Sequence, residues 1–313
     1  MSGTLITGGA GSLGREITRQ LIAENVHQRI VIYSRDEGKQ QAMREEIPEG
    51  GPDGVRYMLG DICDTDRLTA AMKYCDRVIH CAALKMIDTC EYDVYEATRI
   101  NVMGTLSVAK ACTRSHIPRA IYVSTDKAVD PVSTYGFTKG LAEDIWIHSN
   151  LHSDTCSFMA TRYGNVISSA KSVFHQWEKL RMEGKPIPVT HPDVTRYYWT
   201  LSNAANFVLK RLEDGSRGII YAPSMRSYLI HDIAKLYGTP TITGWRCPEK
   251  IHEILWTDHE TSYTTEVGDY YAVYPESHPW GDCPMIGTPV TTTCSSKNHI
   301  SDFKKDFIDG HTP

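Results

Sequence analysis

The stretch Thr4–Gly14 reads TLITGGAGSLG, a short apolar strand that runs directly into glycines spaced as Gly8-x-x-Gly11-x-x-Gly14. A helical stretch, Leu13–Glu24, follows at once. Glycines in this order permit a tight turn and let the backbone approach a pyrophosphate, which then lies on the helix N-terminus. The stretch therefore predicts a dinucleotide site. The contacts predicted from this turn are Gly8, Gly11, Ser12, Leu13 and Gly14.

The alternation of apolar strands and helical stretches continues through the first half of the chain. Strands joined by helical crossovers predict a parallel sheet with helices on both faces, a doubly wound α/β fold of the Rossmann type. The predicted strands are Thr4–Thr7, Arg29–Tyr33, Val55–Leu59, Arg77–His80, Ala120–Ser124 and Ser157–Arg162. The predicted helices are Leu13–Glu24, Lys39–Glu46, Asp66–Lys73, Val94–His116 and Tyr135–Leu151.

This rhythm stops after Arg162, where prolines separate short segments. Short segments separated by prolines predict a smaller mixed α/β lobe that binds substrate at the sheet edge. We expect residues 1–165 to form the dinucleotide-binding domain and residues 166–313 to form a lobe integrated with it. The tail ends in Ile300–Ile308, which predicts a short amphipathic helix.

The bulk composition excludes several classes of protein. Among the 313 residues, 33 basic and 38 acidic side chains give a formal charge of −5, which argues against nucleic acid or an anionic membrane as partner. No stretch is apolar over the roughly 20 residues that span a bilayer, and no signal peptide is expected. Nine cysteines without ligand spacing predict buried thiols, no metal site and a cytoplasmic location.

The end of the second predicted strand bears on the choice of cofactor. Ser34 and Arg35 occupy the place where NAD-preferring sites carry a carboxylate, and Lys39 follows. A hydroxyl and a guanidinium suit a 2′-phosphate, which favours NADP over NAD. The alternative is that Arg35 is a solvated surface charge and Asp36 binds the ribose.

Further cofactor contacts are expected where later strands end and, for Asn101, within the predicted helix Val94–His116. After the third strand an aspartate can meet the adenine edge, and after the fourth strand small residues let the backbone pass close to the cofactor. Asn101 is expected to stabilise the sheet near the site. The residues expected here are Asp61, Ile62, Ala82, Ala83, Lys85 and Asn101.

The run Ser124–Lys139 carries the chemistry. Tyr135 and Lys139 share one face of a helix, and a nearby ammonium lowers the pKa of a tyrosine, so Tyr135 is predicted to act as a base toward a hydroxyl. Both residues are also expected to contact the cofactor. Just upstream, an acid stands beside an amine, Asp126 and Lys127. The alternative for that pair is a surface ion pair.

These motifs resemble the extended short-chain dehydrogenase/reductases, and within them the C5-inverting 4,6-dehydratases of UDP-N-acetylglucosamine from pseudaminic-acid and related polysaccharide pathways. The matching stretches run over nearly the whole chain. They are Thr7–Gly14, Tyr33–Lys39, His80–Lys85, Ser124–Lys139, Arg162–Val166, Thr195–Arg196 and Glu249–Glu253.

The resemblance implies a reaction with its roles. Tyr135 takes the C4 hydroxyl proton while NADP+ accepts the C4 hydride, Lys127 removes the C5 proton, and Asp126 protonates the departing C6 hydroxyl. The hydride then returns to C6, and Thr125 bonds near the C4 hydroxyl. A lysine base must be neutral, so its pKa has to be lowered, with Lys85 as the expected cation. Asp126 needs a raised pKa.

The same resemblance assigns the UDP moiety to the second lobe, through Asn165, Arg196, Arg246 and Glu249, with Lys85 also near the substrate. Each arginine has a surface salt bridge as its alternative. His252 and Glu253 have helical spacing from Glu249 and are expected to pack or cap. The chain departs from the family pattern at Arg246–Lys250, which reads RCPEK, and at Ser168–Ser172, which places the exact sugar in question.

Two rival functions stay open at this point. A UDP-sugar 4-epimerase would use the glycines, Tyr135 and Lys139 without needing Asp126 and Lys127. A non-catalytic NADP-binding regulator typically loses the tyrosine or the lysine, and this chain has both. The resemblance also implies a homo-oligomer, a dimer or a hexamer.

Overall fold

The computed structural model describes residues 3–24, 29–50, 54–167 and 173–275, together with Phe303 and Phe307. The loop Ser168–Ser172 and most of the predicted tail helix Ile300–Ile308 lie outside the described residues.

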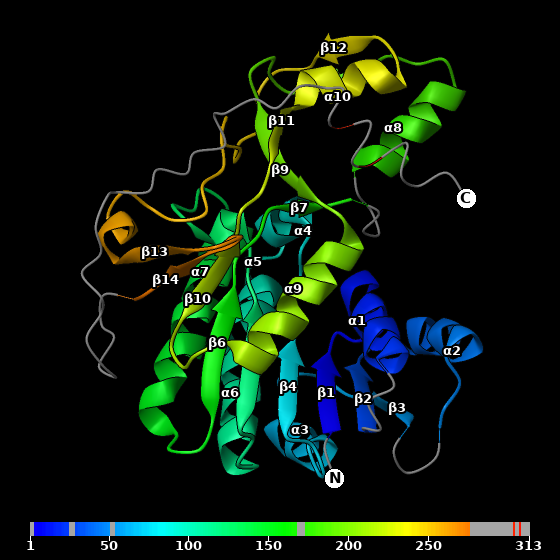
Figure 1. Cartoon of the computed structure of the whole chain (residues 1–313). Helices are drawn as coiled ribbons and strands as arrows, with labels where there is room; N and C mark the ends of the chain where they lie inside the picture. Colours follow the sequence, from blue (N-terminus) through cyan, green and yellow to red (C-terminus); the bar gives the residue numbers. More distant parts are fainter. Residues whose placement is uncertain are drawn as a thin grey trace.

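A nine-stranded sheet forms the centre of the described part of the chain, in the order β13-β14-β10-β6-β5-β4-β1-β2-β3 (Figure 1). The strands from β3 to β10 are parallel, and β14 and β13 are antiparallel to their neighbours. Their bounds are β1 Gly3–Thr7, β2 Arg29–Ser34, β3 Val55–Leu59, β4 Arg77–His80, β5 Arg119–Val123, β6 Ser157–Thr161, β10 Ile220–Pro223, β13 Thr264–Val267 and β14 Tyr270–Val273.

The parallel strands are apolar on both sides because helices cover both faces of the sheet. In β1, Leu5 and Ile6 are both fully buried, and they belong to the separate apolar clusters on the two faces. In β2, Val31 and Ile32 divide in the same way. The strand order β3-β2-β1-β4-β5-β6 reverses direction between β1 and β4, where doubly wound sheets bind ligands.

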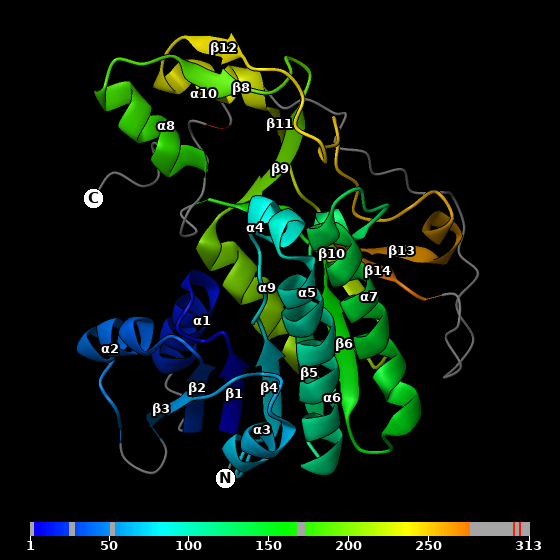
Figure 2. The same ribbon diagram turned by 180° about the vertical axis from the view of Figure 1, so that it is seen from behind.

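Helices α1 and α9 cover one face, and α3, α6 and α7 cover the other (Figures 1 and 2). The helices of this unit are α1 Ser12–Ala23, α2 Glu37–Glu46, α3 Thr65–Ala71, α4 Ile87–Tyr92, α5 Val94–Ala97, α6 Thr105–Arg114, α7 Thr134–His148 and α9 Leu201–Asp214. Short 3-10 helices span Asp126–Ala128, Ser149–His152 and Glu260–Tyr263.

The predicted helix Val94–His116 is divided in the structure. A π-helical segment, Thr98–Gly104, separates α5 from α6. Asn101 lies in this segment, and its amide exchanges two hydrogen bonds with the Leu84 backbone, at 2.8 and 3.0 Å. The segment thus fixes the loop that follows β4.

The smaller lobe lies beyond the carboxyl ends of the parallel strands (Figure 1). It has its own apolar core, in which Trp177, Tyr198 and Tyr228 are almost completely buried and Phe303 packs against them. Its elements are β7 Asn165–Val166, α8 Val173–Met182, β8 Ile187–Val189, β9 Thr195–Trp199, β11 Ser227–Leu229, α10 Ile230–Tyr237 and β12 Pro240–Ile242.

The predicted fold class is confirmed, and the six predicted strands correspond to β1 through β6 within a residue or two at each end. The strands β10, β13 and β14 were not predicted; they come from after residue 166 and extend the main sheet. The division at residue 165 stays a prediction. Among the described residues, no helix is long and apolar enough to cross a bilayer.

Candidate active site

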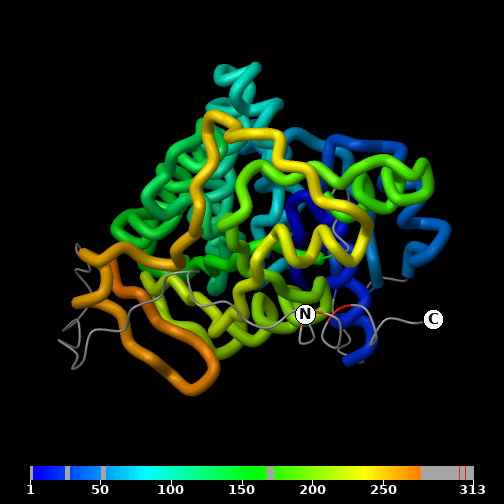
Figure 3. Tube along the Cα trace, turned by 90° about the horizontal axis from the view of Figure 1, so that it is seen from above, coloured from blue at the N-terminus to red at the C-terminus, as the bar shows by residue number. Residues whose placement is uncertain are grey.

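A pocket of about 340 Å³ opens where the smaller lobe meets the carboxyl ends of the strands. Seen from above, green and yellow segments of the lobe lie over this end of the molecule (Figure 3). Residues from both halves of the chain line the pocket. Those that the sequence singled out are Lys127, Asn165, Arg196, Arg246 and Glu249.

The glycine turn after β1 leaves no room for side chains. Gly8 has φ +65°, and a Cβ there would lie 2.8 Å from Ala82 Cα. A Cβ on Gly14 would lie 2.4 Å from Gly9 O. Gly11 is the N-cap of α1 and has no side chain, so the N–H groups of the first helical turn receive no side-chain cap. This cradle fits a dinucleotide pyrophosphate, with Ser12 and Leu13 in the first turn.

The residues at the end of β2 carry exposed ion pairs. Arg35 contacts Glu96 at 3.3 Å and Asp61 at 3.9 Å. Lys39 contacts Asp36 at 2.7 Å, and Asp36 also caps α2. Ser34 Oγ accepts a hydrogen bond from Gln40. The charged groups that a 2′-phosphate or a ribose could address are therefore present at this strand end.

Asp61 and Ile62 follow β3 as expected. Burial alone raises the pKa of Asp61, but hydrogen bonds from the Cys63 N–H and from Arg99 lower it, and the net direction is downward. Ile62 is buried in the core.

The loop after β4 holds the remaining predicted cofactor contacts. Ala82 packs against the glycine turn, as the close approach of its Cα to Gly8 shows. Ala83 follows it, and Lys85 is exposed.

The acid and the amine form a contact pair at the end of β5. Lys127 Nζ donates to Asp126 Oδ1 at 3.0 Å and to Asn165 Oδ1 at 3.3 Å. Thr125 Oγ1 donates to the same Asp126 oxygen, at 3.0 Å. The other carboxylate oxygen, Oδ2, is buried and has no hydrogen-bond partner among the described residues. Asp126 is fully buried and Lys127 lines the pocket, so the pair is no surface salt bridge.

Burial and neighbouring charges shift the pKa of both Asp126 and Lys127. Burial raises the pKa of Asp126, as its predicted role requires, and Glu253 raises it further. Burial alone would lower the pKa of Lys127, but the carboxylates of Asp126 and Glu253 raise it. The prediction of a lowered Lys127 pKa is therefore wrong for this structure. Arg196, rather than the expected Lys85, is the cation among the main influences.

Tyr135 and Lys139 lie on α7 one turn apart. Lys139 was predicted to lower the pKa of Tyr135, and this effect is not found. Lys139 Nζ donates to Val123 O at 2.7 Å and lies 4.0 Å from the centre of the Tyr122 ring. Burial lowers the pKa of Lys139 to about 7. Burial raises the pKa of Tyr135 to about 12, while Lys127 and a hydrogen bond with Thr125 act in the opposite direction. The predicted downward shift of Tyr135 is wrong because desolvation dominates.

Helix α7 begins close to the 3-10 turn Asp126–Ala128. Ser133 caps it by accepting from Gly136 N at 3.0 Å. A Cβ on Gly136 would lie 2.4 Å from the Lys127 carbonyl oxygen, so only glycine lets the helix approach this near. The helix and the 3-10 turn Asp126–Ala128 are thus packed backbone against backbone.

The predicted UDP-contacting residues line the pocket, and two of them, Arg196 and Glu249, form an ion pair with each other. Arg196 donates to Glu249 Oε1 at 3.0 Å and to the Lys250 carbonyl at 2.9 Å. Arg246 is exposed at the pocket rim. The structure therefore brings Asn165, Arg196, Arg246 and Glu249 together.

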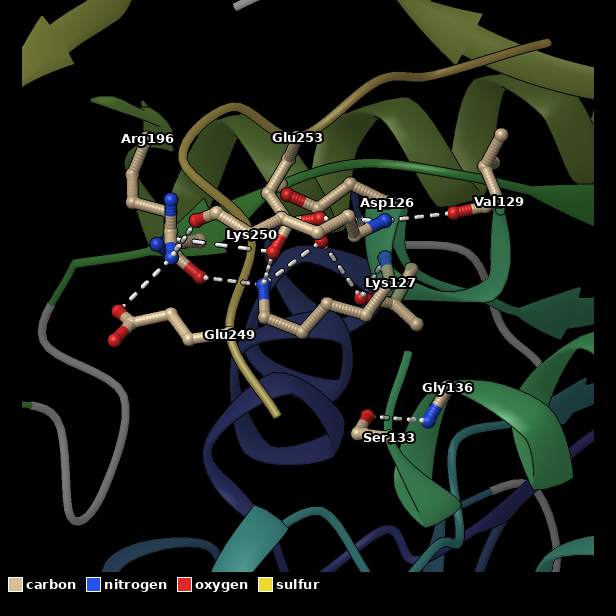
Figure 4. Close-up of polar contacts among 12 residues, drawn as sticks. Asp126, Lys127, Val129, Ser133, Gly136, Arg196, Glu249, Lys250 and Glu253 are labelled. Carbon is tan, nitrogen blue, oxygen red and sulfur yellow. Dashed lines mark hydrogen bonds and ion pairs between the residues drawn. The ribbon is translucent and has the colours of Figure 1, made fainter. Parts of the chain in front are cut away.

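Sequence reasoning missed Glu253. The segment Glu249–Glu253 is not helical, so the expected packing or capping role from helical spacing is wrong. Instead, the buried Glu253 lies between Lys127, Arg196 and Lys250 (Figure 4). The sequence signal that was available is the run of alternating charges at 249, 250 and 253, immediately after the candidate phosphate-binding arginine.

Comparison with known proteins places the chain among sugar-nucleotide enzymes. The model of the polysaccharide biosynthesis protein family matches residues 4–275. The UDP-N-acetylglucosamine 4,6-dehydratase (inverting) of Campylobacter jejuni subsp. jejuni is 37% identical over 277 residues, which are 87% of this chain and 82% of the relative. The UDP-glucose 4-epimerase of Rickettsia bellii is 33% identical over 282 residues, 86% of this chain and 82% of the relative.

Solved structures agree in fold. Pen from Bacillus thuringiensis superposes with a TM-score of 0.88 at 26% identity, covering 97% of this chain and 95% of that one. The dTDP-glucose 4,6-dehydratase DesIV from Streptomyces venezuelae, solved with NAD and TYD bound, gives a TM-score of 0.71 at 19% identity, covering 81% and 87%. The resemblance to nucleotide-sugar dehydratases is confirmed, and the chain belongs to the polysaccharide biosynthesis protein family.

Proposed function

We propose that this protein dehydrates UDP-N-acetylglucosamine to a UDP-4-keto-6-deoxy sugar with inversion at C5. The observation that carries the proposal is the hydrogen bond of 3.0 Å between the fully buried Asp126 and Lys127, which lines the pocket. An elimination needs an acid and a base beside the same substrate, and here they are adjacent. The inverting dehydratase of Campylobacter jejuni, at 37% identity, supports the same reaction.

Each residue of the site has a separate role in the proposed reaction. A nicotinamide held at the glycine turn would supply a hydride acceptor for C4 and a hydride donor for C6. Tyr135 takes the proton of the C4 hydroxyl as a phenolate, the form that Lys127 and the hydrogen bond with Thr125 favour. Lys127 Nζ removes the C5 proton, and Asp126 gives its proton to the departing C6 hydroxyl. After the hydride has returned to C6, a proton is added at C5 on the opposite face, so one water is lost, C5 is inverted and no net oxidant is consumed.

The resting pair differs from the reacting pair by the place of one proton. The carboxylates of Asp126 and Glu253 raise the pKa of Lys127 and favour its ammonium form, while burial raises the pKa of Asp126 and makes it easier to protonate. Reaction needs the neutral amine and the carboxylic acid. The 3.0 Å hydrogen bond between Lys127 Nζ and Asp126 Oδ1 is a direct path for that proton.

The cofactor proposed is NADP rather than NAD. Arg35 is supported in this role because its ion pairs with Glu96 and Asp61 are exposed and weak, so a 2′-phosphate competes with them readily. We expect NADP+ to bind about tenfold or more tightly than NAD+ in calorimetric titration, and Arg35→Ala to remove most of that preference. Equal binding of the two dinucleotides by the natural chain would contradict this choice.

The UDP moiety is assigned to the rim formed by Asn165, Arg196, Arg246 and Glu249. Arginine suits a diphosphate because its planar fork donates two bonds at once. Arg246 is free to turn toward a ligand at the exposed rim, whereas Arg196 gives up part of its bond to Glu249.

We also propose that the enzyme works in the cytoplasm as a homo-oligomer. Large apolar side chains are exposed on α4 and the residue before it, α5, the π segment and α7, elements that lie close together in Figure 2. Exposed apolar side chains gathered on neighbouring elements indicate an interface. The residues are Met86, Tyr92, Val94, Tyr95, Met103, Phe137 and Leu141.

The experiment is mass spectrometry and proton NMR of the product made from UDP-N-acetylglucosamine without added reductant. Loss of one water is expected. An unchanged mass with a different C4 configuration would mean an epimerase, the activity named for the Rickettsia bellii relative. Unchanged substrate in the presence of NADP+ would refute the proposed substrate, and binding of NADP+ without turnover of other UDP-sugars would indicate a regulator.

A further inference from the structure

Glu253 is a buried carboxylate that the proposed reaction does not use. Its side chain is 3% exposed, yet it lines the pocket. Three cations surround it: Lys250 at 3.0 Å, Lys127 at 3.7 Å and Arg196 at 4.0 Å. A buried charge is costly unless it is paired, so this arrangement fixes the carboxylate in one place.

We propose that Glu253 is a positioning residue of the active site: its carboxylate, fixed by Lys250 and Arg196, holds the Lys127 amine beside Asp126. This inference rests on the proposed function insofar as Lys127 is the base for C5. Figure 4 shows Lys127, Glu253 and Arg196 turned toward one another across the pocket wall.

The first support is the geometry around the amine. Lys127 Nζ has Asp126 on one side and Glu253 on another, with Asn165 as a neutral third partner. A flexible lysine side chain needs several fixed acceptors to stay in one rotamer, because its conformational entropy opposes order. Glu253 adds a second carboxylate, 3.7 Å from the amine, from the segment Glu249–Glu253.

The second support is the connection through Lys250. Its amine contacts Glu253 at 3.0 Å and donates to the Val129 and Asp130 carbonyls at 2.8 and 3.2 Å. The segment that contains Glu249, Lys250 and Glu253 is thereby fastened to the turn that directly follows Asp126 and Lys127. Lys250 thus connects the proposed UDP-binding segment to the turn that carries Lys127.

The charge of Glu253 also acts on the proton equilibrium. The groups that face Lys127 are Asp126, Glu253, Arg196 and the Tyr135 hydroxyl, and those that face Glu253 are Lys127, Arg196 and Lys250. The Glu253 carboxylate raises the pKa of Lys127 and of Asp126. Removing it should make the Lys127 amine neutral at a lower pH.

The test measures the reactivity of Lys127 directly. The purified full-length chain is treated with trace acetic anhydride at a fixed pH of about 9, below the raised Lys127 pKa, where reactivity follows the neutral fraction. Labelling of the Lys127 peptide is quantified by mass spectrometry relative to the exposed Lys179. Glu253→Gln should increase Lys127 labelling by about tenfold or more, since an opposite charge within this range shifts a pKa by about one unit or more.

Two further variants make the result specific. Asp88→Asn removes a carboxylate from the exposed rim of the same pocket and should leave Lys127 labelling unchanged. Glu253→Asp keeps the charge but withdraws it by one methylene, so a smaller increase of about two- to fivefold is expected. If Glu253→Gln does not fold, as judged by circular dichroism, Glu253→Asp decides the question. Unchanged labelling in the folded variants, or an equal increase in Asp88→Asn, would overturn the proposal.

Labelling needs no substrate, so the two proposals fail in different ways. A natural chain that does not dehydrate UDP-N-acetylglucosamine refutes the function and leaves the Glu253 effect measurable. Where the dehydratase is active, Glu253→Gln should also move the acidic limb of the pH profile of kcat to lower pH. A fall in kcat without such a move would indicate a merely structural residue and would contradict the proposal.

Discussion

Asp126 and Lys127 are neighbours in the chain, and their side chains meet in a 3.0 Å hydrogen bond beside the pocket that Lys127 lines. What distinguishes them from a surface pair is burial, because Asp126 is fully enclosed and one of its oxygens has no hydrogen-bond partner among the described residues. In a low-dielectric setting such a carboxylate favours its protonated form. The pair therefore holds one proton that can lie on either member, as elimination of water requires.

Loss of the base should stop the elimination. Lys127→Ala is expected to lower kcat for dehydration by about 100-fold or more, the usual range for removal of a general base. Product formation is followed by mass spectrometry, with Lys179→Ala as the control for an exposed lysine. Near-normal turnover in Lys127→Ala would show that another group removes the C5 proton.

Lys139 should give the folded protein a measurable pH dependence. Its pKa is lowered from the usual 10.5 to about 7, so between these values the unfolded chain binds more protons than the folded one. Stability therefore rises with pH in this window. Relative to Lys139→Met, the natural chain should gain about 2 kcal/mol of unfolding free energy between about pH 7.5 and about pH 9.

Urea unfolding at the two pH values measures this difference. Lys179→Met serves as control, and its unfolding free energy should change in parallel with that of the natural chain. A constant gap between the natural chain and Lys139→Met would mean that Lys139 is protonated in the folded state throughout.

At the residue scale, the sequence predicted which side chains gather but not how they influence one another. Tyr135 and Lys139 have the expected spacing, yet their burial, set by strands and helices far away in the chain, reverses the expected pKa shift of Tyr135. Glu253 could not be assigned because its partners, Lys127 and Arg196, are distant in sequence.

At the scale of elements, the approach of α7 to the 3-10 turn Asp126–Ala128 depends on Gly136. Gly136→Ala would place a Cβ 2.4 Å from the Lys127 carbonyl, so the turn that carries Asp126 and Lys127 must shift. A displacement of this size can lower kcat by up to about 100-fold. Gly140→Ala, on the same helix, meets the Ala128 carbonyl at 3.0 Å and should have a smaller effect. Equal kcat values for the two variants would contradict this account.

A second element-level contact joins α7 to the end of β6. Arg162 donates to both oxygens of Glu143, and it also pairs with Glu260 at 2.9 Å. Because Arg162 and Glu143 are buried, Arg162→Met leaves an unpaired charge and should cost about 3–5 kcal/mol of unfolding free energy. The double variant Arg162→Met/Glu143→Met should recover part of this loss in urea unfolding. The argument would be contradicted if the double variant lost more unfolding free energy than the two single variants lose together.

The elements themselves were predictable where hydrophobic pattern is strong. The strands β1 to β6 are short apolar runs with helices between them, and their parallel order follows from right-handed crossovers. β10, β13 and β14 were not predictable because their place in the main sheet depends on long-range pairing with β6 and with one another.

At the scale of the whole molecule, the apolar side chains on α4, α5 and α7 bear on assembly. Tyr92 and Tyr95 are 94% and 92% exposed, which is unusual for rings of this size. Phe137→Glu together with Leu141→Glu should dissociate the proposed homo-oligomer, because a buried unpaired charge opposes association. Sedimentation velocity measures the mass, and Val267→Glu, on the exposed strand β13, is the control. A natural chain that sediments as a monomer would refute the assembly.

The pocket between the two parts of the molecule supports one central claim, that Lys127 and Asp126 remove water across C5 and C6 with inversion at C5. Proton NMR of the product formed from UDP-N-acetylglucosamine in D2O tests it most directly. The account predicts a 4-keto-6-deoxy sugar with one deuterium at C5 and coupling constants of the inverted configuration. A product with retained C5 configuration, or one that keeps the original C5 proton, would contradict it.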